Sequence, residues 1–198
     1  MDSVLIIRAC TGEKAGNTVC SQLQAVLQKE GIEVQLETGD KILQEPGVIK
    51  ETVIFVFPLL MESVPSEVLA LWEKIASCCK GLYVCAVIHN GLLEAGKGIS
   101  AAAAFHSFCR SSGALYGGTF CIGTDWMTDQ LIMRLPFSSR LRQFAKAVME
   151  KRPADLKVQA LWSRDAFCEA NRKNWEKRGR EFGCTKAQMD ISRISRKA

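Results

Sequence analysis

The segment with the most potential for chemistry is a short loop near the N-terminus, from Cys10 to Thr18, which reads Cys-Thr-Gly-Glu-Lys-Ala-Gly-Asn-Thr. It holds two glycines, which let a ligand approach the backbone, and two hydroxyl side chains, and it directly precedes an expected helix. The free N–H groups at a helix N-terminus attract anions. We therefore predict a phosphate-binding loop with contacts from Cys10, Thr11, Gly16, Asn17 and Thr18. The same residue types also form an ordinary helix cap.

The spacing within this loop excludes two common nucleotide-binding motifs. Gly12 and Gly16 are one residue too close for the loop of nucleoside triphosphatases, and Asn17 occupies the position where that motif requires lysine. The Gly-x-Gly-x-x-Gly fingerprint of dinucleotide-binding domains is absent as well. We therefore predict that the loop binds a phosphate group without using either of these two motifs.

Two further loops follow apolar runs of strand length. The first is Pro58-Leu-Leu-Met-Glu-Ser-Val-Pro65, and the second is His89-Asn-Gly-Leu-Leu-Glu-Ala95. If the preceding runs are parallel strands, both loops lie at the carboxyl edge of the sheet beside the first loop. Ligands of open α/β sheets bind at this edge.

The elements that position these loops alternate along the chain. Apolar and β-branched runs predict five strands, at Ser3–Ala9, Ile32–Leu36, Thr52–Phe57, Leu82–Ile88 and Leu115–Ile122. Helical patterns predict helices between them: one capped by Asn17 and running to Glu30, one at Ser66–Cys79 and one at about Ile99–Ser112. This order predicts an α/β fold with a doubly wound, five-stranded parallel sheet and right-handed crossovers.

Beyond Gly123 the strand pattern stops. Two more helical stretches follow, at Ser138–Lys151 and Arg164–Arg180. No linker-like segment separates them from the rest. We therefore predict a single domain over residues 1–198, with a core of βαβ units at 1–123 and extra C-terminal helices at 124–198 packed on that core.

Composition restricts the class of protein. Hydrophobic residues make up 47% and charged residues 24% of the chain, as in ordinary globular proteins. No apolar run reaches the roughly 20 residues that a membrane span requires, so we predict a protein with no membrane association. The nine cysteines show no zinc spacing, which favours reduced, buried thiols, no metal site and a cytoplasmic location.

The net charge of +5 is uneven along the chain. Ten Lys and Arg residues against five Asp and Glu residues lie between Arg164 and Ala198. A basic face of this kind could attract a phosphate-bearing ligand or an acidic partner, and it is equally compatible with a solvated helix. We predict no nucleic-acid partner.

Several of these segments together resemble a known family. A buried strand that ends in Phe57-Pro58-Leu59, followed by Val-Pro-Ser at the start of a helix, is similar to the flavin loop of NAD(P)H-dependent FMN reductases and related flavodoxin-like proteins. The Asn-Gly-Leu-Leu-Glu turn and the Tyr-Gly-Gly-Thr-Phe-Cys-Ile-Gly segment at residues 116–123 are similar to corresponding parts of that family. The resemblance covers residues 3–123 and implies a flavodoxin-like fold.

The resemblance also implies a cofactor and an activity. It implies FMN, with its phosphate on the first loop and its isoalloxazine ring between the second and third. The implied ring contacts are Pro58, Leu59, Leu60, Met61, Glu62, Asn90, Gly91, Leu92 and Glu94. The implied function is an FMN-dependent oxidoreductase that takes hydride from NADH or NADPH and reduces small-molecule electron acceptors such as quinones or free flavin. Relatives often form homodimers, and no catalytic residue is identified by the motifs.

Two other functions stay open. One is an electron-transfer flavodoxin, although such proteins usually present a strongly acidic face and this chain is neutral to basic. The other is a flavodoxin-like protein that has lost the cofactor and acts as a binding module. The second alternative is favoured by Arg8 and Cys10 in the first loop and by the absence of an aromatic residue in the second, for which Trp126 could substitute.

Overall fold

The computed structural model describes residues 3–10, 14–60, 62–128 and 131–189, so the predicted contacts of Thr11 and Met61 lie outside the described residues. The chain divides into two compact units, residues 1–160 and residues 161–198. The first unit contains the sheet and all three predicted loops. Each unit is described by itself.

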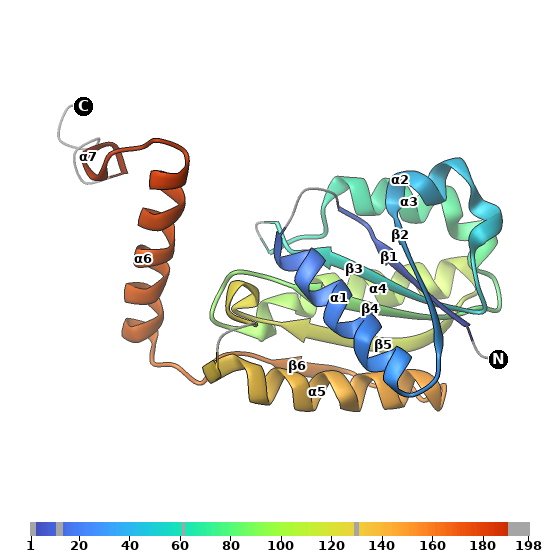
Figure 1. Ribbon diagram of the computed structural model, residues 1–198. Helices are drawn as coiled ribbons and strands as arrows, with labels where there is room; N and C mark the ends of the chain where they lie inside the picture. Colours follow the sequence, from blue (N-terminus) through green and yellow to red (C-terminus); the bar gives the residue numbers. More distant parts are fainter. Residues whose placement is uncertain (1–2, 11–13, 61, 129–130, 190–198) are drawn as a thin grey trace. The chain divides into compact units, whose positions relative to one another are not determined.

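A parallel sheet forms the centre of the first unit (Figure 1). Its strand order is β2-β1-β3-β4-β5-β6, and every neighbouring pair is parallel. The strands are β1 (Ser3–Arg8), β2 (Glu33–Thr38), β3 (Thr52–Pro58), β4 (Tyr83–His89), β5 (Leu115–Ile122) and β6 (Leu156–Val158). This confirms the predicted α/β fold with a doubly wound parallel sheet.

Helices cover both faces of the sheet. Figure 1 shows α1 (Lys14–Lys29) and α5 (Leu131–Met149) on one face, where they contact each other. The opposite face carries α2 (Gly39–Gln44), α3 (Ser66–Ile75) and α4 (Ile99–Ser112). Short 3-10 turns complete the connections, at Pro46–Val48, Ala76–Cys79, Ala95–Gly98 and Asp125–Met127.

The core explains why the strands are apolar on both sides. Successive side chains of a strand point to opposite faces, so Leu5 and Ile7 pack toward α3 and α4 while Val4 and Ile6 face α1 and α5. On the α3/α4 face the rings of Trp72 and Phe108 stack with centroids 5.0 Å apart. Six of the nine cysteines are buried and all nine are free thiols, which agrees with their interpretation as small hydrophobic residues.

Two predictions about the elements were wrong. Helix α1 begins at Lys14, so Asn17 is not its N-cap and Thr18 lies in its second turn. Lys14 and Ala15 are good helix formers, and the Asn17 side chain accepts a hydrogen bond from Arg8 instead of capping the helix. The sheet also has a sixth strand, β6, in the stretch predicted to hold only helices. A three-residue strand is too short to give a periodic signal.

The second unit contains α6 (Arg164–Glu181), close to the predicted helix, and the short α7 (Lys186–Met189). Ser163 caps α6 by accepting the N–H of Ala166 at 3.2 Å. Along the helix, Arg172 pairs with Glu169 at 2.7 Å and also with Glu176. The expectation that these C-terminal helices pack on the sheet stays a prediction. Among the described helices, none is long and apolar enough to cross a membrane.

Candidate functional site

The candidate site is the carboxyl edge of the parallel sheet, where the loops after β1, β3, β4 and β5 begin. Pro58 of β3 is in register with His89 of β4, so the second and third predicted loops start side by side. The N–H of Leu59 donates to the carbonyl of His89 at 2.8 Å and ties the two loops together. The N–H of Asn90 donates to Ile122 of β5 at 2.9 Å. The second and third predicted loops therefore begin at one edge of the sheet, as the sequence predicts.

The first predicted loop has a different form from the one expected. Because α1 begins at Lys14, Gly16 lies in its first turn, where backbone N–H groups have no partner within the helix. Thr18 lies one turn further on, where its N–H bonds to the carbonyl four residues earlier. The backbone N–H of Gly16 can therefore donate a hydrogen bond to an anion, whereas the N–H of Thr18 cannot.

Arg8 brings a positive charge to this first turn. It ends β1, and its guanidinium donates a hydrogen bond to Oδ1 of Asn17 on the exposed side of α1. Its Nε is buried and has no hydrogen-bond acceptor among the described residues. An unsatisfied buried donor costs about 1–3 kcal/mol, so this N–H is suited to an acceptor that a ligand supplies. Cys10, one residue from the strand end, is buried.

The second loop is closed by its own contacts. Leu60 and Ser63 exchange backbone hydrogen bonds of 3.1 and 2.9 Å, and Glu62 between them adopts a left-handed φ of 62°. The carboxylate of Glu62 pairs with Lys97 at 2.8 Å, and hydrogen bonding to that carboxylate raises the pKa of Lys97. Leu60 is 54% exposed. The loop therefore presents an exposed apolar side chain, while Glu62 holds the turn that follows the third loop.

The third loop contains the buried side-chain amide of Asn90, of which only the oxygen is hydrogen-bonded among the described residues. Oδ1 of Asn90 accepts the N–H of Leu92 at 2.9 Å, and the side chain is only 3% exposed. Its Nδ2 is buried and has no acceptor in the described part of the chain. Beside it, Gly91 accepts the indole N–H of Trp126 at 3.3 Å. Leu92 and Glu94 are exposed at this loop.

A buried histidine and a carboxylate join the third loop to α1. Nδ1 of His89 lies 2.7 Å from Oδ2 of Asp125, and His89 is 1% exposed. Its other ring nitrogen, Nε2, faces Gly16, where an added Cβ would lie only 3.3 Å away. The carboxylate favours the tautomer that carries the proton on Nδ1. The site thus includes a rigid contact from Asp125 through His89 to the first turn of α1.

Asp125 was not predicted as a site residue. The only signal in the sequence is that Gly123-Thr-Asp-Trp directly follows β5, so its residues must emerge at the same edge as the other loops. His89 and Trp126 were recognised as neighbours of the site without an assigned contact. Among the predicted residues that are described, Asn90, Gly91 and Leu92 share one loop with His89, and Gly16 lies against it. Glu62 is engaged by Lys97 instead.

Comparison with known proteins gives matches at the level of structure only. No protein-family model matches the chain, and no curated protein matches it. A short-chain flavodoxin associated with a non-canonical PDU bacterial microcompartment is 13% identical, with a TM-score of 0.56, covering 76% of this chain and 98% of that chain. A Fusobacterium nucleatum flavodoxin bound to flavin mononucleotide is 10% identical, with a TM-score of 0.56 and coverage of 77% and 99%.

A third solved structure, the apo form of an NADH:FMN oxidoreductase, is 11% identical, with a TM-score of 0.56 and coverage of 77% of this chain and 89% of that chain. At these identities the likeness concerns the arrangement of the elements alone. Together with the strand order and the helices on both faces, it shows that this chain has a flavodoxin-like fold.

Proposed function

We propose that the chain binds FMN at the carboxyl edge of its sheet and acts as an NAD(P)H-dependent oxidoreductase of small acceptors such as quinones or free flavin. The observation that carries the proposal is the buried Nδ2 of Asn90 in the third loop of a flavodoxin-like fold, a donor that has no acceptor among the residues that the structure describes. A buried donor of this kind is stabilised when a ligand supplies the acceptor.

The residues present fit the two ends of FMN. The isoalloxazine ring offers carbonyl oxygens and ring nitrogens as acceptors, which suits Asn90, and Leu59 and Leu60 offer apolar contacts to its faces. The phosphate needs donors and positive charge. Arg8, with its unpaired buried Nε, and the first-turn N–H of Gly16 would supply them. The predicted contact of Thr11 would add a hydroxyl.

The chain's residues would hold the cofactor and control its surroundings. Bound FMN would supply the redox chemistry, since it accepts hydride from a nicotinamide and passes electrons to an acceptor. The His89–Asp125 pair keeps the third loop in place against α1, because both partners are buried and 2.7 Å apart. Apolar side chains of the second loop would exclude water from one side of the ring.

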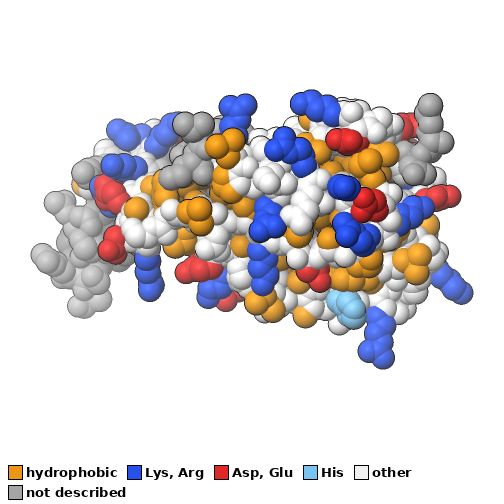
Figure 2. Space-filling model, turned by 90° about the horizontal axis from the view of Figure 1, so that it is seen from below, with side chains coloured by type: hydrophobic (Ala, Val, Ile, Leu, Met, Phe, Trp, Pro, Cys, Tyr) orange, Lys and Arg blue, Asp and Glu red, His pale blue; other side chains and the backbone are white. Residues whose placement is uncertain are grey.

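The surface supports an enzyme more than an electron carrier. Figure 2 shows Lys and Arg side chains spread over the drawn face, with the acidic side chains scattered among them. The whole chain carries a net charge of +5. An acidic docking face of the kind that electron-transfer flavodoxins use is therefore not favoured. A cytoplasmic homodimer stays part of the proposal.

The first experiment is a visible absorption spectrum of the purified chain before and after incubation with FMN. We expect a bound flavin spectrum, followed by steady oxidation of NADH or NADPH once a quinone or free flavin is added. Bound flavin that dithionite reduces but neither nicotinamide reduces would exclude the reductase. A chain that stays colourless would support the cofactor-free binding module.

The decisive variant is Asn90→Asp. It keeps an oxygen for the N–H of Leu92 and removes the Nδ2 donor. Loss of a hydrogen bond to a buried ligand costs about 1.5 kcal/mol, so we expect FMN affinity to fall about tenfold or more. Asn171→Asp, in α6, is the matched control and should leave affinity unchanged. Equal affinity in the wild-type chain and Asn90→Asp would remove the main support for the site.

A further inference from the structure

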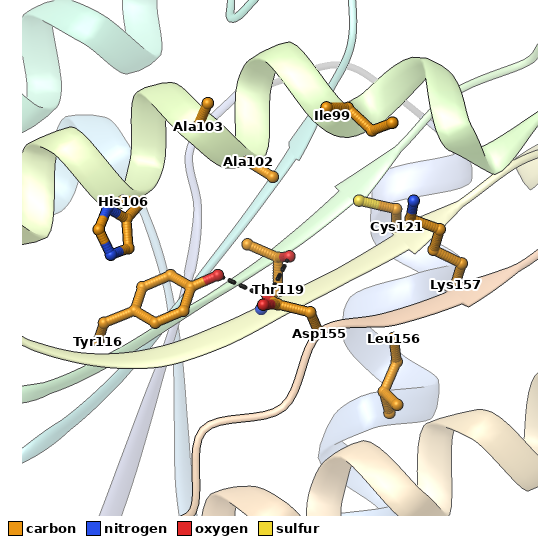
Figure 3. A pocket seen from close by; sticks show the side chains of 10 residues that line it. All are labelled: Ile99, Ala102, Ala103, His106, Tyr116, Thr119, Cys121, Asp155, Leu156 and Lys157. Atoms are coloured by element: carbon orange, nitrogen blue, oxygen red, sulfur yellow. Dashed lines mark hydrogen bonds between the residues drawn. The ribbon is translucent and has the colours of Figure 1, made fainter.

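A pocket lies away from the carboxyl-edge loops, between α4 and the last two strands (Figure 3). Its volume is ≈ 420 Å³, within the range of small-molecule sites. The sheet reaches beyond α4 on this side, so β5 forms the floor and the segment at β6 forms one wall. None of the predicted flavin contacts lines it.

The polar centre of the pocket is the carboxylate of Asp155. Its Oδ1 accepts three hydrogen bonds, from the Tyr116 hydroxyl at 2.5 Å, the Thr119 N–H at 2.9 Å and the Thr119 hydroxyl at 2.8 Å. Partial burial alone would raise the pKa of Asp155, but these hydrogen bonds outweigh it and lower the pKa. All three bonds end on Oδ1, so Oδ2 of the ionised carboxylate remains for a ligand.

Lys157 of β6 places a positive charge two residues after Asp155, which directly precedes the strand. Figure 3 shows the side chains of Asp155 and Lys157 on the pocket side of the segment, with Leu156 pointing away between them. Both charges act on the thiol of Cys121: burial raises its pKa to about 11, Lys157 lowers it and Asp155 raises it. Within the described residues, neither Asp155 nor Lys157 forms an ion pair.

The remaining walls are apolar and flat. In Figure 3 the Ala102 side chain of α4 points toward the floor, and Ile99 and Ala103 also line the pocket. The His106 ring meets the Tyr116 ring edge-on with centroids 4.9 Å apart. The small alanines leave room for an aliphatic chain that runs from one charge to the other.

The two nucleophile candidates of the pocket are held in their protonated forms. Burial is the largest cause that raises the pKa of the Tyr116 phenol, and burial also raises the pKa of the Cys121 thiol. A protonated phenol and a protonated thiol are poor nucleophiles at neutral pH. The pocket is therefore suited to binding a ligand and not to covalent chemistry on it.

We propose that this pocket binds a small zwitterion, a short-chain ω-amino acid. Its ammonium group is held by Oδ2 of Asp155, its carboxylate by Nζ of Lys157, and its methylene groups lie along Ala102 and Ala103. The Cα atoms of residues two apart in extended backbone are about 6.6 Å apart, so the two charged side chains start from separate points, which favours a ligand with its charges at the two ends of a chain. Two opposite charges that form no ion pair among the described residues, next to the apolar side chains of α4, favour such a ligand over a simple cation or anion.

The probes for the test are 6-aminohexanoate and its isomer norleucine, whose charges sit on adjacent groups. Hexylamine and hexanoate carry only one of the two charges. Titration calorimetry on the full chain, with ¹⁵N spectra that follow the Thr119 amide, measures affinity and location together. We expect 6-aminohexanoate to bind about fivefold more tightly than the other three, since an ion pair of an exposed side chain contributes up to about 1 kcal/mol. It should also shift the Thr119 amide signal.

Substitutions test separately the two charges of the pocket and its shape. Asp155→Asn keeps an oxygen for Tyr116 and Thr119, and Lys157→Gln removes the cation; each should weaken binding of 6-aminohexanoate about fivefold. The matched controls, Asp40→Asn and Lys29→Gln, change exposed residues elsewhere and should leave binding unchanged. Ala102→Phe, at a half-buried position of α4 whose side chain points toward the floor, should abolish binding by filling the pocket while both charges stay in place.

Three results would overturn the proposal. The first is no binding of 6-aminohexanoate to the folded wild-type chain, and the second is equal affinity for 6-aminohexanoate and norleucine. The third is unchanged binding in a folded Asp155→Asn variant. The same titrations repeated after loading with FMN should give the same affinity, because the pocket and the flavin contacts do not share residues.

Discussion

Individual polar atoms, more than motifs, carry the proposals for the two sites. Among the described residues, the Nδ2 of Asn90 and the Nε of Arg8 are buried donors without acceptors, whereas Asp155 is exposed and the three hydrogen bonds to its carboxylate leave Oδ2 to solvent or a ligand. Most buried polar groups in folded proteins are paired, so unpaired ones point to a ligand. Each such atom can be tested by a substitution that changes one group and keeps its neighbours.

The hydrogen bonds to Asp155 should be detectable in how the free energy of unfolding changes at acid pH. They lower the pKa of this carboxyl below its usual value of 3.8, so its contribution to stability is complete above that pH and is lost as pH falls through the folded-state pKa. Asp155→Asn cannot titrate. We expect its free energy of unfolding, measured by urea denaturation, to fall less between about pH 5 and pH 2 than that of the wild type. Identical pH profiles would contradict the assigned hydrogen bonds.

Gly16 should be required by the packing of His89 against α1. A Cβ at this position would lie 3.3 Å from Nε2 of His89, and the branched side chain of valine would need still more room. We expect Gly16→Val to reduce the free energy of unfolding by about 1–3 kcal/mol through overpacking. Ala15→Val introduces the same residue one position earlier and controls for the lower helix propensity of valine. Equal losses in the two variants would show that the contact does not matter.

Among the elements, the connection from α5 to β6 determines how the second pocket is built. β5 contains Gly117 and Gly118 opposite a register shift in β4 between Val84 and Ala86. Gly118 has a φ of 101°, and the backbone of Ala154 lies against it so closely that a Cβ would be 2.2 Å from its carbonyl oxygen. This close approach brings Asp155 within reach of Tyr116 and Thr119.

Gly118→Ala should therefore separate β6 from β5. Strain at a positive φ and the clash with Ala154 act together, so we expect a loss of about 3 kcal/mol or more in unfolding free energy. Gly81→Ala also introduces a side chain at a positive φ, of 77°, but into open space, and should cost about 1–2 kcal/mol. Thermal and urea unfolding of both variants distinguish the cost of backbone strain at a positive φ from the cost of the clash with Ala154. If Gly118→Ala loses no more unfolding free energy than Gly81→Ala, the close contact with Ala154 does not contribute to stability.

Because α1 begins at Lys14, a substitution in its first turn should affect phosphate binding more than one in its second turn. Ala15 lies in the first turn and Thr18 in the second. A carboxylate in the first turn stabilises the helix by about 0.3–1 kcal/mol but repels an anion at its N-terminus. We expect Ala15→Glu to weaken FMN binding about fivefold or more, and Thr18→Glu to weaken it less, in fluorescence titrations. The reverse order would place the phosphate elsewhere.

For the whole molecule, the division into two units has a direct consequence. All six strands and the core cluster on the α3/α4 face lie within residues 1–160. A chain that ends at Ala160 should therefore fold cooperatively, with an unfolding free energy within about 1 kcal/mol of the full chain, and should keep both proposed sites. Denaturant unfolding and FMN titration of the shortened chain test this. A shortened chain that fails to fold would show that residues 161–198 complete the core.

The amino-acid sequence by itself determined the alternation of strands and helices, the five long strands and the edge at which the ligand loops meet. Local periodicity and the apolar character of doubly buried strands are enough for these features, because they depend on neighbours in the chain. Asn90 could be singled out for the same reason, as a polar residue directly after a buried strand.

Only the tertiary structure decided the rest. Helix α1 begins at Lys14, and the Asn17 side chain, the predicted cap, instead accepts a hydrogen bond from Arg8, nine residues earlier in the chain. The pairing of His89 with Asp125 and of Asp155 with Tyr116 joins residues 36 and 39 positions apart, and three-residue β6 is a strand only because β5 lies beside it. Such contacts arise when the folded chain brings distant segments together, and no local pattern encodes which distant partner each residue meets.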